Sequence, residues 1–161
     1  MTTANSASDS VSTDAVRQVV AEIVGLRAWG VALGLGSFLT ISFGEADAAA
    51  EAGSARGEWY LWAYQCAWRL DRDEEALCAS EDERGLIRSS VAELEDRAIR
   101  SFDVTATQDA TIAFDGALVL RFFPVHARER RHWMLWRPGG RVVIAGPGSS
   151  WHDAAADEPL A

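Results

Sequence analysis

The sequence predicts an α+β fold in which two helices pack against an antiparallel meander sheet. Apolar residues recur at helical spacing in two segments, and several short runs alternate apolar with polar residues. Turn residues separate these runs, as at Asp115-Gly116 and at Pro138-Gly139-Gly140. The pattern predicts six to eight strands, arranged as one continuous sheet or as a flattened barrel with the helices outside.

The chain has 161 residues, which is the length of one domain. All periodic segments fall within residues 13–152, so this range is predicted to be a single α+β domain. Residues 1–12 and 153–161 show no periodicity and are predicted to be disordered tails. Within the domain, residues 13–70 and 80–145 both run from a helix into strands, which predicts a pseudo-duplicated fold.

A seven-residue motif carries most of this likeness between the halves. Arg-x-x-Trp-x-Leu-Trp occurs at residues 56–62 and again at residues 130–136. The offset between matching positions drifts along the chain, so small insertions are required. Two interpretations stay open: a true duplication, and the recurrence of aromatic and β-branched residues that is common to β domains.

In the first half, the elements expected in chain order are a helix at residues 13–24, strands at 29–35 and 38–43, a loop at 44–56 and a long strand at 58–70. Thr13 or Asp14 can cap the helix, and Gly25 can end it. Strict alternation along the long strand places Trp59 and Trp62 on opposite faces.

In the second half, the expected elements are a helix at residues 80–94 and strands at 98–105, 110–114, 117–124, 132–136 and 141–145. Ser80 and Glu83 have the spacing of a capping box. In that motif the serine side chain accepts the backbone N–H of the glutamate, and the glutamate side chain accepts the backbone N–H of the serine. Asp115-Gly116 is typical of a type I′ hairpin turn between two of the strands.

Composition and charge argue against several classes of function. The net charge of −9 argues against nonspecific nucleic-acid binding, which needs a positive surface. No apolar run approaches the ~20 residues that span a bilayer, and the first residues lack the features of a secretory signal. Two cysteines are too few for a disulfide scaffold, so a cytoplasmic location is expected. Arginine without lysine, together with much alanine and glycine, suggests a bacterial genome rich in G and C.

Five tryptophans on predicted strands allow two interpretations; they are Trp59, Trp62, Trp68, Trp133 and Trp136. They could fill the core of a small sheet, which is the commoner role of large aromatic residues. They could instead line a pocket for a ring-bearing ligand. The ligand-binding candidates are Trp59, Trp62, Trp133 and Trp136.

An acidic segment is the most suggestive surface. Residues 71–83 hold seven acidic residues and one arginine. The last three acids lie in the first turn of the predicted helix, where negative charge is favourable. The others have no such local role and could attract a basic partner protein. The partner-binding candidates are therefore Asp71, Asp73, Glu74 and Glu75.

The remaining polar motifs do not indicate a reaction. His126 and His132 frame an HxxExxH sequence, but their spacing does not match a helical metal site, and no metal or cofactor is expected. Ser149 or Cys66 could act as nucleophile with His152 or His126. No G-x-S-x-G motif surrounds Ser149, however, and Cys66 lies within a predicted aromatic strand, where a structural thiol is usual. The protein is therefore predicted not to be an enzyme.

Several motifs resemble an uncharacterised family of small bacterial proteins known only as domains of unknown function. They are Gly57 to Trp62, Cys66 to Arg69, Ala79 to Asp82, Trp133 to Leu135 and Gly146 to Trp151. The resemblance covers about residues 24–151 and implies a fold rather than an activity. In general character, small acidic α+β domains are also similar to immunity proteins of bacterial toxin systems.

Taken together, the sequence predicts a non-enzymatic cytoplasmic protein-interaction domain, immunity-like, that binds a basic protein through its acidic loop. The alternative is a small-ligand binding domain with an aromatic pocket. Neither nucleic acid nor membrane is expected as a partner, and an uncovered edge strand could support a homodimer.

Overall fold

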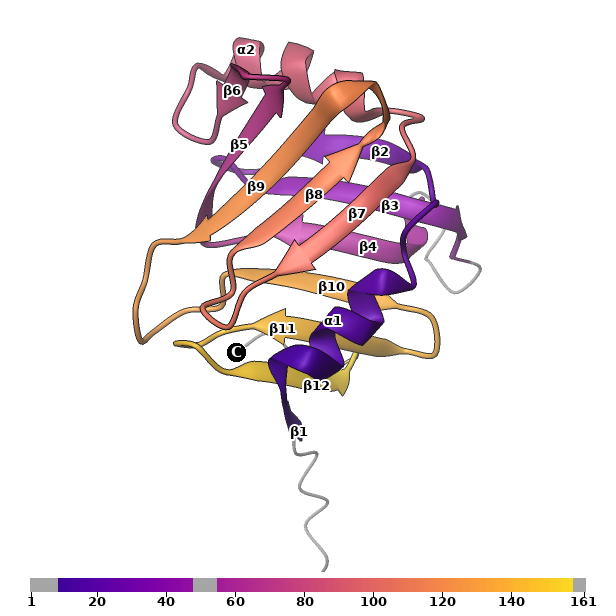
Figure 1. The fold of residues 1–161 in the computed structure, drawn as a ribbon, viewed down its shortest axis with the longest axis vertical. Helices are drawn as coiled ribbons and strands as arrows, with labels where there is room; N and C mark the ends of the chain where they lie inside the picture. The colour runs from indigo at the N-terminus through magenta and orange to yellow at the C-terminus, as the bar shows by residue number, and fades with distance from the viewer. Residues whose placement is uncertain (1–8, 48–54, 158–161) are drawn as a thin grey trace, which may run out of the picture.

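The structure is a computed structural model that describes residues 9–47 and 55–157. Within these residues the chain forms a seven-stranded and a five-stranded antiparallel sheet (Figure 1). The strands of the larger sheet are β1 (Asp9–Val11), β2 (Ala28–Leu33), β3 (Leu39–Ala46), β4 (Gly57–Ala63), β10 (Trp133–Arg137), β11 (Arg141–Ala145) and β12 (Trp151–Ala155). The strands of the smaller sheet are β5 (Cys66–Arg72), β6 (Glu75–Ala79), β7 (Ile99–Val104), β8 (Ala110–Phe114) and β9 (Leu118–Pro124).

The described helices flank the sheets. They are α1 (Thr13–Ala21), α2 (Arg84–Val91) and two single 3-10 turns (Ala92–Leu94 and Asp115–Ala117). The smaller sheet lies across one part of the larger sheet, and α1 covers the adjoining part over β10 to β12 (Figure 1). α2 lies at the opposite end of the molecule, beside β5 and β6 (Figure 1).

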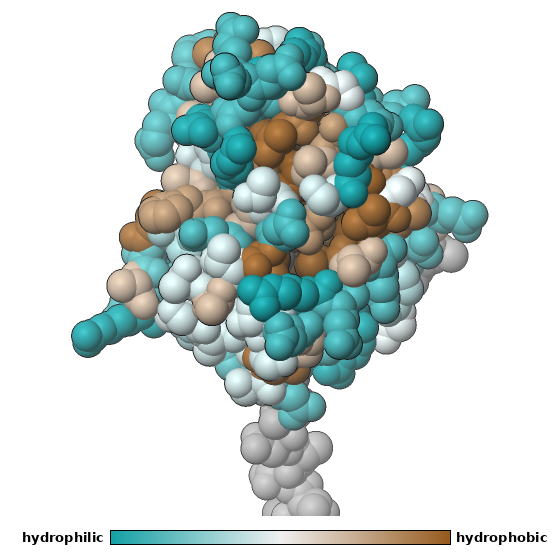
Figure 2. Space-filling model, in the orientation of Figure 1, coloured by the Kyte–Doolittle hydropathy of each residue, from teal (hydrophilic) through white to brown (hydrophobic). Residues whose placement is uncertain are grey.

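The main core lies between the two sheets. Alternate residues of both sheets fill it, among them Leu61, Ile112, Leu120 and Trp133, which are all almost fully buried. α1 adds Val16 and Val20 to the same core. The outer face of the smaller sheet, seen in Figure 2, mixes apolar patches with hydrophilic residues.

The chain exchanges strands between the sheets. β2, β3 and β4 form a meander in the larger sheet, and the next hairpin, β5 and β6, joins the smaller sheet. β7, β8 and β9 form a meander in the smaller sheet, and the next hairpin, β10 and β11, joins the larger one. β4 pairs with β10 and β9 pairs with β5, so each hairpin extends the meander of the other half.

These sheets correct two parts of the predicted architecture. The described strands form two separate sheets of seven and five strands, neither of which closes into a barrel, instead of one sheet of six to eight strands. β1, β6 and β12 were not predicted because their sequences lack the alternation of a half-buried strand. Pairing with a partner strand, rather than local pattern, makes these segments extended.

The long strand predicted at residues 58–70 is in fact two strands in different sheets. The chain leaves β4 at Tyr64 and enters β5 at Cys66. The N–H groups of Tyr64 and Gln65 both donate to the carbonyl of His132, at 3.0 Å each. This two-residue link reverses the alternation: odd-numbered residues such as Leu61 point into the core from β4, whereas even-numbered residues such as Trp68 do so from β5.

The N-cap residues of both helices differ from those predicted. Ser12 caps α1, because its side chain accepts the N–H of Ala15. The capping box at the second helix does not form: Glu83 caps α2 by accepting the N–H groups of Gly85 and Leu86, and these bonds lower its pKa below the usual value. Ser80 instead accepts the N–H of Trp68 in β5.

Parts of the two segments predicted to be disordered tails are in fact strands. Residues 9–11 pair with residues 151–153, and β12 continues to Ala155 along β11. The indole of Trp151 donates to the hydroxyl of Thr13, which joins the end of the sheet to the start of α1. Residues 1–8 and 158–161 lie outside the described residues.

Gly57 gives a test of the packing at the start of β4. A Cβ atom at this position would lie 2.5 Å from the carbonyl oxygen of Phe43 and 2.8 Å from that of Trp59. Because backbone atoms cannot give way as a flexible side chain can, we expect Gly57→Ala to lower the free energy of unfolding by roughly 2–3 kcal/mol, as measured by urea denaturation.

Gly34→Ala is the matched control, since a Cβ there would make only ordinary contacts with Phe38. This variant should change the free energy of unfolding by less than about 1 kcal/mol. Equal effects of the two substitutions would contradict the backbone packing described for Gly57.

Candidate functional site

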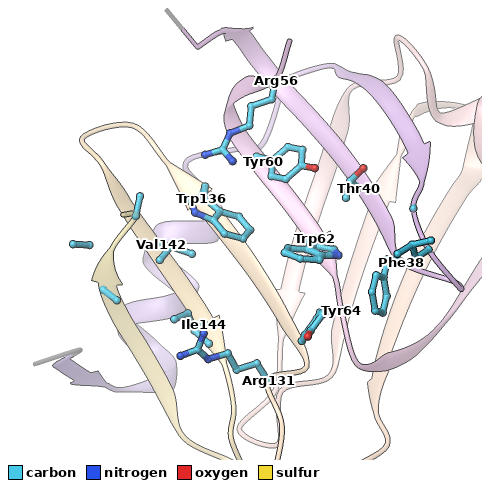
Figure 3. A pocket seen from close by; sticks show the side chains of 15 residues that line it. Phe38, Thr40, Arg56, Tyr60, Trp62, Tyr64, Arg131, Trp136, Val142 and Ile144 are labelled. Atoms are coloured by element: carbon cyan, nitrogen blue, oxygen red, sulfur yellow. The ribbon is translucent and has the colours of Figure 1, made fainter. Parts of the chain in front are cut away.

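The outer face of the larger sheet carries a hollow lined mainly by aromatic and aliphatic side chains (Figure 3). An antiparallel sheet of this kind normally presents polar residues to water on such a face. The hollow, called the aromatic groove below, has a volume of about 680 Å³, within the range of small-ligand sites. It is lined by Gly34, Leu35, Phe38, Thr40, Arg56, Tyr60, Trp62, Tyr64, Arg131, Trp136, Val142, Ile144 and residues 154–156.

β4 and β10 form the floor of the groove, and they carry the two copies of the Arg-x-x-Trp-x-Leu-Trp motif. The two strands are antiparallel neighbours, with Trp136 opposite Tyr60 and Met134 opposite Trp62. In each copy the two tryptophans are three residues apart, so alternation sends them to opposite faces of the sheet. The second tryptophan of each copy, Trp62 and Trp136, therefore faces the groove.

The aromatic rings of the groove hold one another in place. Trp62 and Trp136 stack with ring centroids 6.1 Å apart and an interplanar angle of 24°. Tyr64 lies edge-on to Trp62 at 4.9 Å, and Phe38 lies edge-on to Trp62 at 6.0 Å. Beneath the rings, aliphatic residues of the same face are packed: Met134, Val142, Ile144 and Ala154 are all buried. The groove is thus a second, smaller apolar cluster on the far side of the sheet from the main core.

An arginine lies at each end of the groove (Figure 3). The guanidinium carbon of Arg56 lies 4.9 Å from the ring centroid of Tyr60 and 5.4 Å from that of Trp136, which is cation–π geometry. Arg131 approaches the opposite end from the segment that precedes β10. The ion pairs of the described residues include neither of these two arginines.

Polar groups in the groove are few. The indole N–H of Trp62 is buried and has no hydrogen-bond partner among the described residues. The hydroxyl of Thr40 donates to the carbonyl of Ala32 at 3.4 Å. No histidine, cysteine, aspartate or glutamate is among the described residues that line the groove.

The structure separates the four tryptophans that the sequence suggests as ligand-binding residues. Trp62 and Trp136 line the groove. Trp59 and Trp133 point the other way into the main core, where Trp133 packs against Phe102, Phe122 and Trp151. Arg56 and Arg131 were not among the site residues predicted from the sequence. Arg56 could have been predicted, because it is the first residue of the motif. Arg131 could not, because the arginine of the second copy is Arg130.

The predicted partner-binding acids lie on the β5–β6 hairpin. Asp71 is buried and is bound by two arginines: Arg69 donates to it at 2.7 Å from Nε, and Arg121 of β9 forms a close ion pair with it. Asp73 and Glu74 form the exposed turn, and Glu75 is exposed at the start of β6. Asp71 thus holds two strands together, while the other three carboxylates face water.

The nucleophile and metal candidates lie apart from the groove. Ser149 is exposed in the turn before β12, and Cys66 is buried at the start of β5. His126 is exposed, whereas His132 is fully buried with its Nε2 atom 3.0 Å from the carbonyl of Gly148. Among the described residues, no three histidine, cysteine, aspartate or glutamate side chains lie close enough together to hold a metal ion.

Comparisons with protein-family models, with curated proteins and with solved structures gave no match. The function is therefore argued from the geometry of the chain itself. None of the described helices is long and apolar enough to cross a bilayer.

The two cysteines give a test of the main core. Both are free thiols, and burial raises the pKa of the Cys66 thiol to about 12. Because only the thiolate reacts with a disulfide reagent, Cys66 should stay unreactive at pH 8 while the protein is folded. A Cys78→Ala variant isolates this thiol, and Ellman's reagent reports its rate of reaction.

We expect the reaction to be slowed at least ~100-fold relative to the same variant in concentrated urea, where the ordinary pKa returns. Rapid reaction of the folded variant would contradict the burial of Cys66.

Proposed function

We propose that the protein binds a small, largely apolar ligand in the aromatic groove. The observation that carries this proposal is the continuous aromatic surface on a sheet face that normally carries polar residues. Large exposed apolar patches on soluble proteins mark binding sites. The hollow shape and the volume of about 680 Å³ favour a small molecule over a flat protein surface as the occupant.

The floor of the groove is suited to binding. Its rings stand on two paired central strands, β4 and β10, whose opposite faces are packed into the main core. Side chains on such a support keep their positions, so little conformational entropy is lost when a ligand binds. The stacked pair Trp62 and Trp136 offers a flat surface for an aromatic or otherwise planar body.

The groove offers binding groups rather than catalytic ones. Its described polar side chains are arginine, tyrosine, tryptophan and threonine, which do not exchange protons readily near pH 7. General acid–base catalysis uses groups whose pKa lies near the working pH. A non-enzymatic role therefore remains our proposal.

The exposed end of the β5–β6 hairpin is a second candidate surface. Asp73, Glu74 and Glu75 are exposed there, and three adjacent carboxylates can attract a basic protein. Asp71, the fourth predicted residue, already has two arginines as partners. The groove combines a hollow with apolar walls, so we favour it over the hairpin turn. An immunity-like role, a cytoplasmic location, a bacterial source and a homodimer stay predictions.

We also infer that the two halves are pseudo-duplicated. Both have a helix, a three-stranded meander and a hairpin in the same order, and the hairpins are exchanged between the sheets. An isolated antiparallel bridge joins Arg27 to Ala98 at the start of the two meanders. The duplication accounts for the floor of the groove, since it places the two copies of the motif side by side.

The neutral fluorescent probe N-phenyl-1-naphthylamine tests the ligand-binding proposal. It should bind with a blue-shifted, enhanced emission and should quench tryptophan fluorescence. Trp62→Leu removes one ring of the stacked pair, at a half-buried position. It should weaken binding of the probe by about 3–10-fold, which corresponds to the free energy of one aromatic pair.

Phe123→Leu is the matched control, because Phe123 is 61% exposed on β9 and does not line the groove. It should leave the affinity for the probe unchanged. No binding by the native protein, or equal losses in both variants, would refute the groove as the binding site.

A further inference from the structure

We propose that the natural ligand of the aromatic groove is an organic anion, whose apolar body lies on the rings and whose acidic group binds Arg56. This inference rests on the ligand-binding function proposed above and adds the charge of the ligand and the residue that recognises it.

The charge of the groove is opposite to that of the protein. The chain has 24 acidic residues against 15 arginines and a net charge of −9. The described residues that line the groove nevertheless include two arginines and no carboxylate. A cation next to apolar walls is screened less by water, so its attraction for an anion is stronger than on an open surface. The groove is thus a positive site on a negative protein.

Arg56 is held ready for an anion. Its guanidinium group rests on Tyr60 and Trp136, with the distances of 4.9 and 5.4 Å to their ring centroids. Stacking uses the flat face of the guanidinium, whereas its N–H groups point outward in the plane of the group. These donors can bind a carboxylate or a sulfonate through two parallel hydrogen bonds. Because the side chain is already ordered by the rings, its ordering costs less on binding.

Arg131 contributes differently. Its backbone is fixed because the adjacent residue, His132, donates its N–H to Ala145 at 2.8 Å and is fully buried. No ring contact or ion pair among the described residues holds the Arg131 guanidinium. This arginine therefore adds positive potential at the far end of the groove, and we assign the acidic group of the ligand to Arg56.

A matched pair of probes separates charge from shape. N-phenyl-1-naphthylamine and 1-anilinonaphthalene-8-sulfonate share the same ring system, but only the second carries a sulfonate. Their dissociation constants are measured by fluorescence at low salt, and competition between them shows whether they share the groove. We expect the anionic probe to bind at least ~10-fold more tightly than the neutral one.

Variants then assign the anion site. Arg56→Gln should reduce the preference for the anionic probe to less than ~2-fold, because it weakens the anionic probe far more than the neutral one. Arg56→Lys keeps the charge without the planar fork and should give an intermediate preference. Arg131→Gln should reduce the preference by only ~2–3-fold. Arg88→Gln removes an exposed positive charge of α2, outside the groove, and should change neither constant.

The possible outcomes distinguish the two proposals. If the neutral probe binds and the anionic probe binds no more tightly, the anion proposal is overturned while the groove remains a ligand site. If Arg56→Gln leaves the preference unchanged, Arg56 is not the anion site and the proposal fails. If neither probe binds the native protein, the ligand-binding function fails and the anion proposal fails with it.

Discussion

The carbonyl of His132 is the contact on which both the sheets and the groove depend. It accepts the N–H groups of Tyr64 and Gln65, at the point where the chain passes from the larger sheet to the smaller one. His132 is itself fixed on both sides, by its N–H to Ala145 and by its ring against Gly148. Since a carbonyl only accepts, the ring must donate from Nε2 in this contact. One buried residue therefore holds together the ends of β4, β5, β10 and β11.

The alternation along β4 decides which of its side chains reach the groove. With the chain turned at Tyr64, the residues of β4 keep one alternation, in which Leu61 points inward and Trp62 outward. The antiparallel pairing of β4 with β10 then brings Trp136 beside Trp62. The same pairing separates the two arginines, because the strands approach the groove from opposite ends. The pairing of β4 with β10 therefore places an arginine at each end of the groove and the aromatic rings between them.

The sequence predicted those parts of the molecule that depend on local periodicity. The α+β class, both helices and the opposite orientation of Trp59 and Trp62 follow from residue spacing alone. The break in the strand at residues 64–65 could not be predicted, because the carbonyl that fixes it belongs to residue 132. The strand pairing of residues 9–11 and the ion pairs of Asp71 likewise depend on residues remote in sequence. For the site, the motif identified two of its aromatic residues, but only the strand order shows that its two copies are neighbours.

The tight fit around His132 makes the groove sensitive to substitutions well away from it. The ring lies against the turn at Gly146, where a Cβ atom would come within 3.0 Å of Nε2 and 2.7 Å of the carbonyl of Arg130. A side chain at this glycine would have to push aside the segment that carries Arg131. If the groove binds a ligand as proposed, a substitution in the turn before β12 would alter ligand preference without changing a residue that lines the groove.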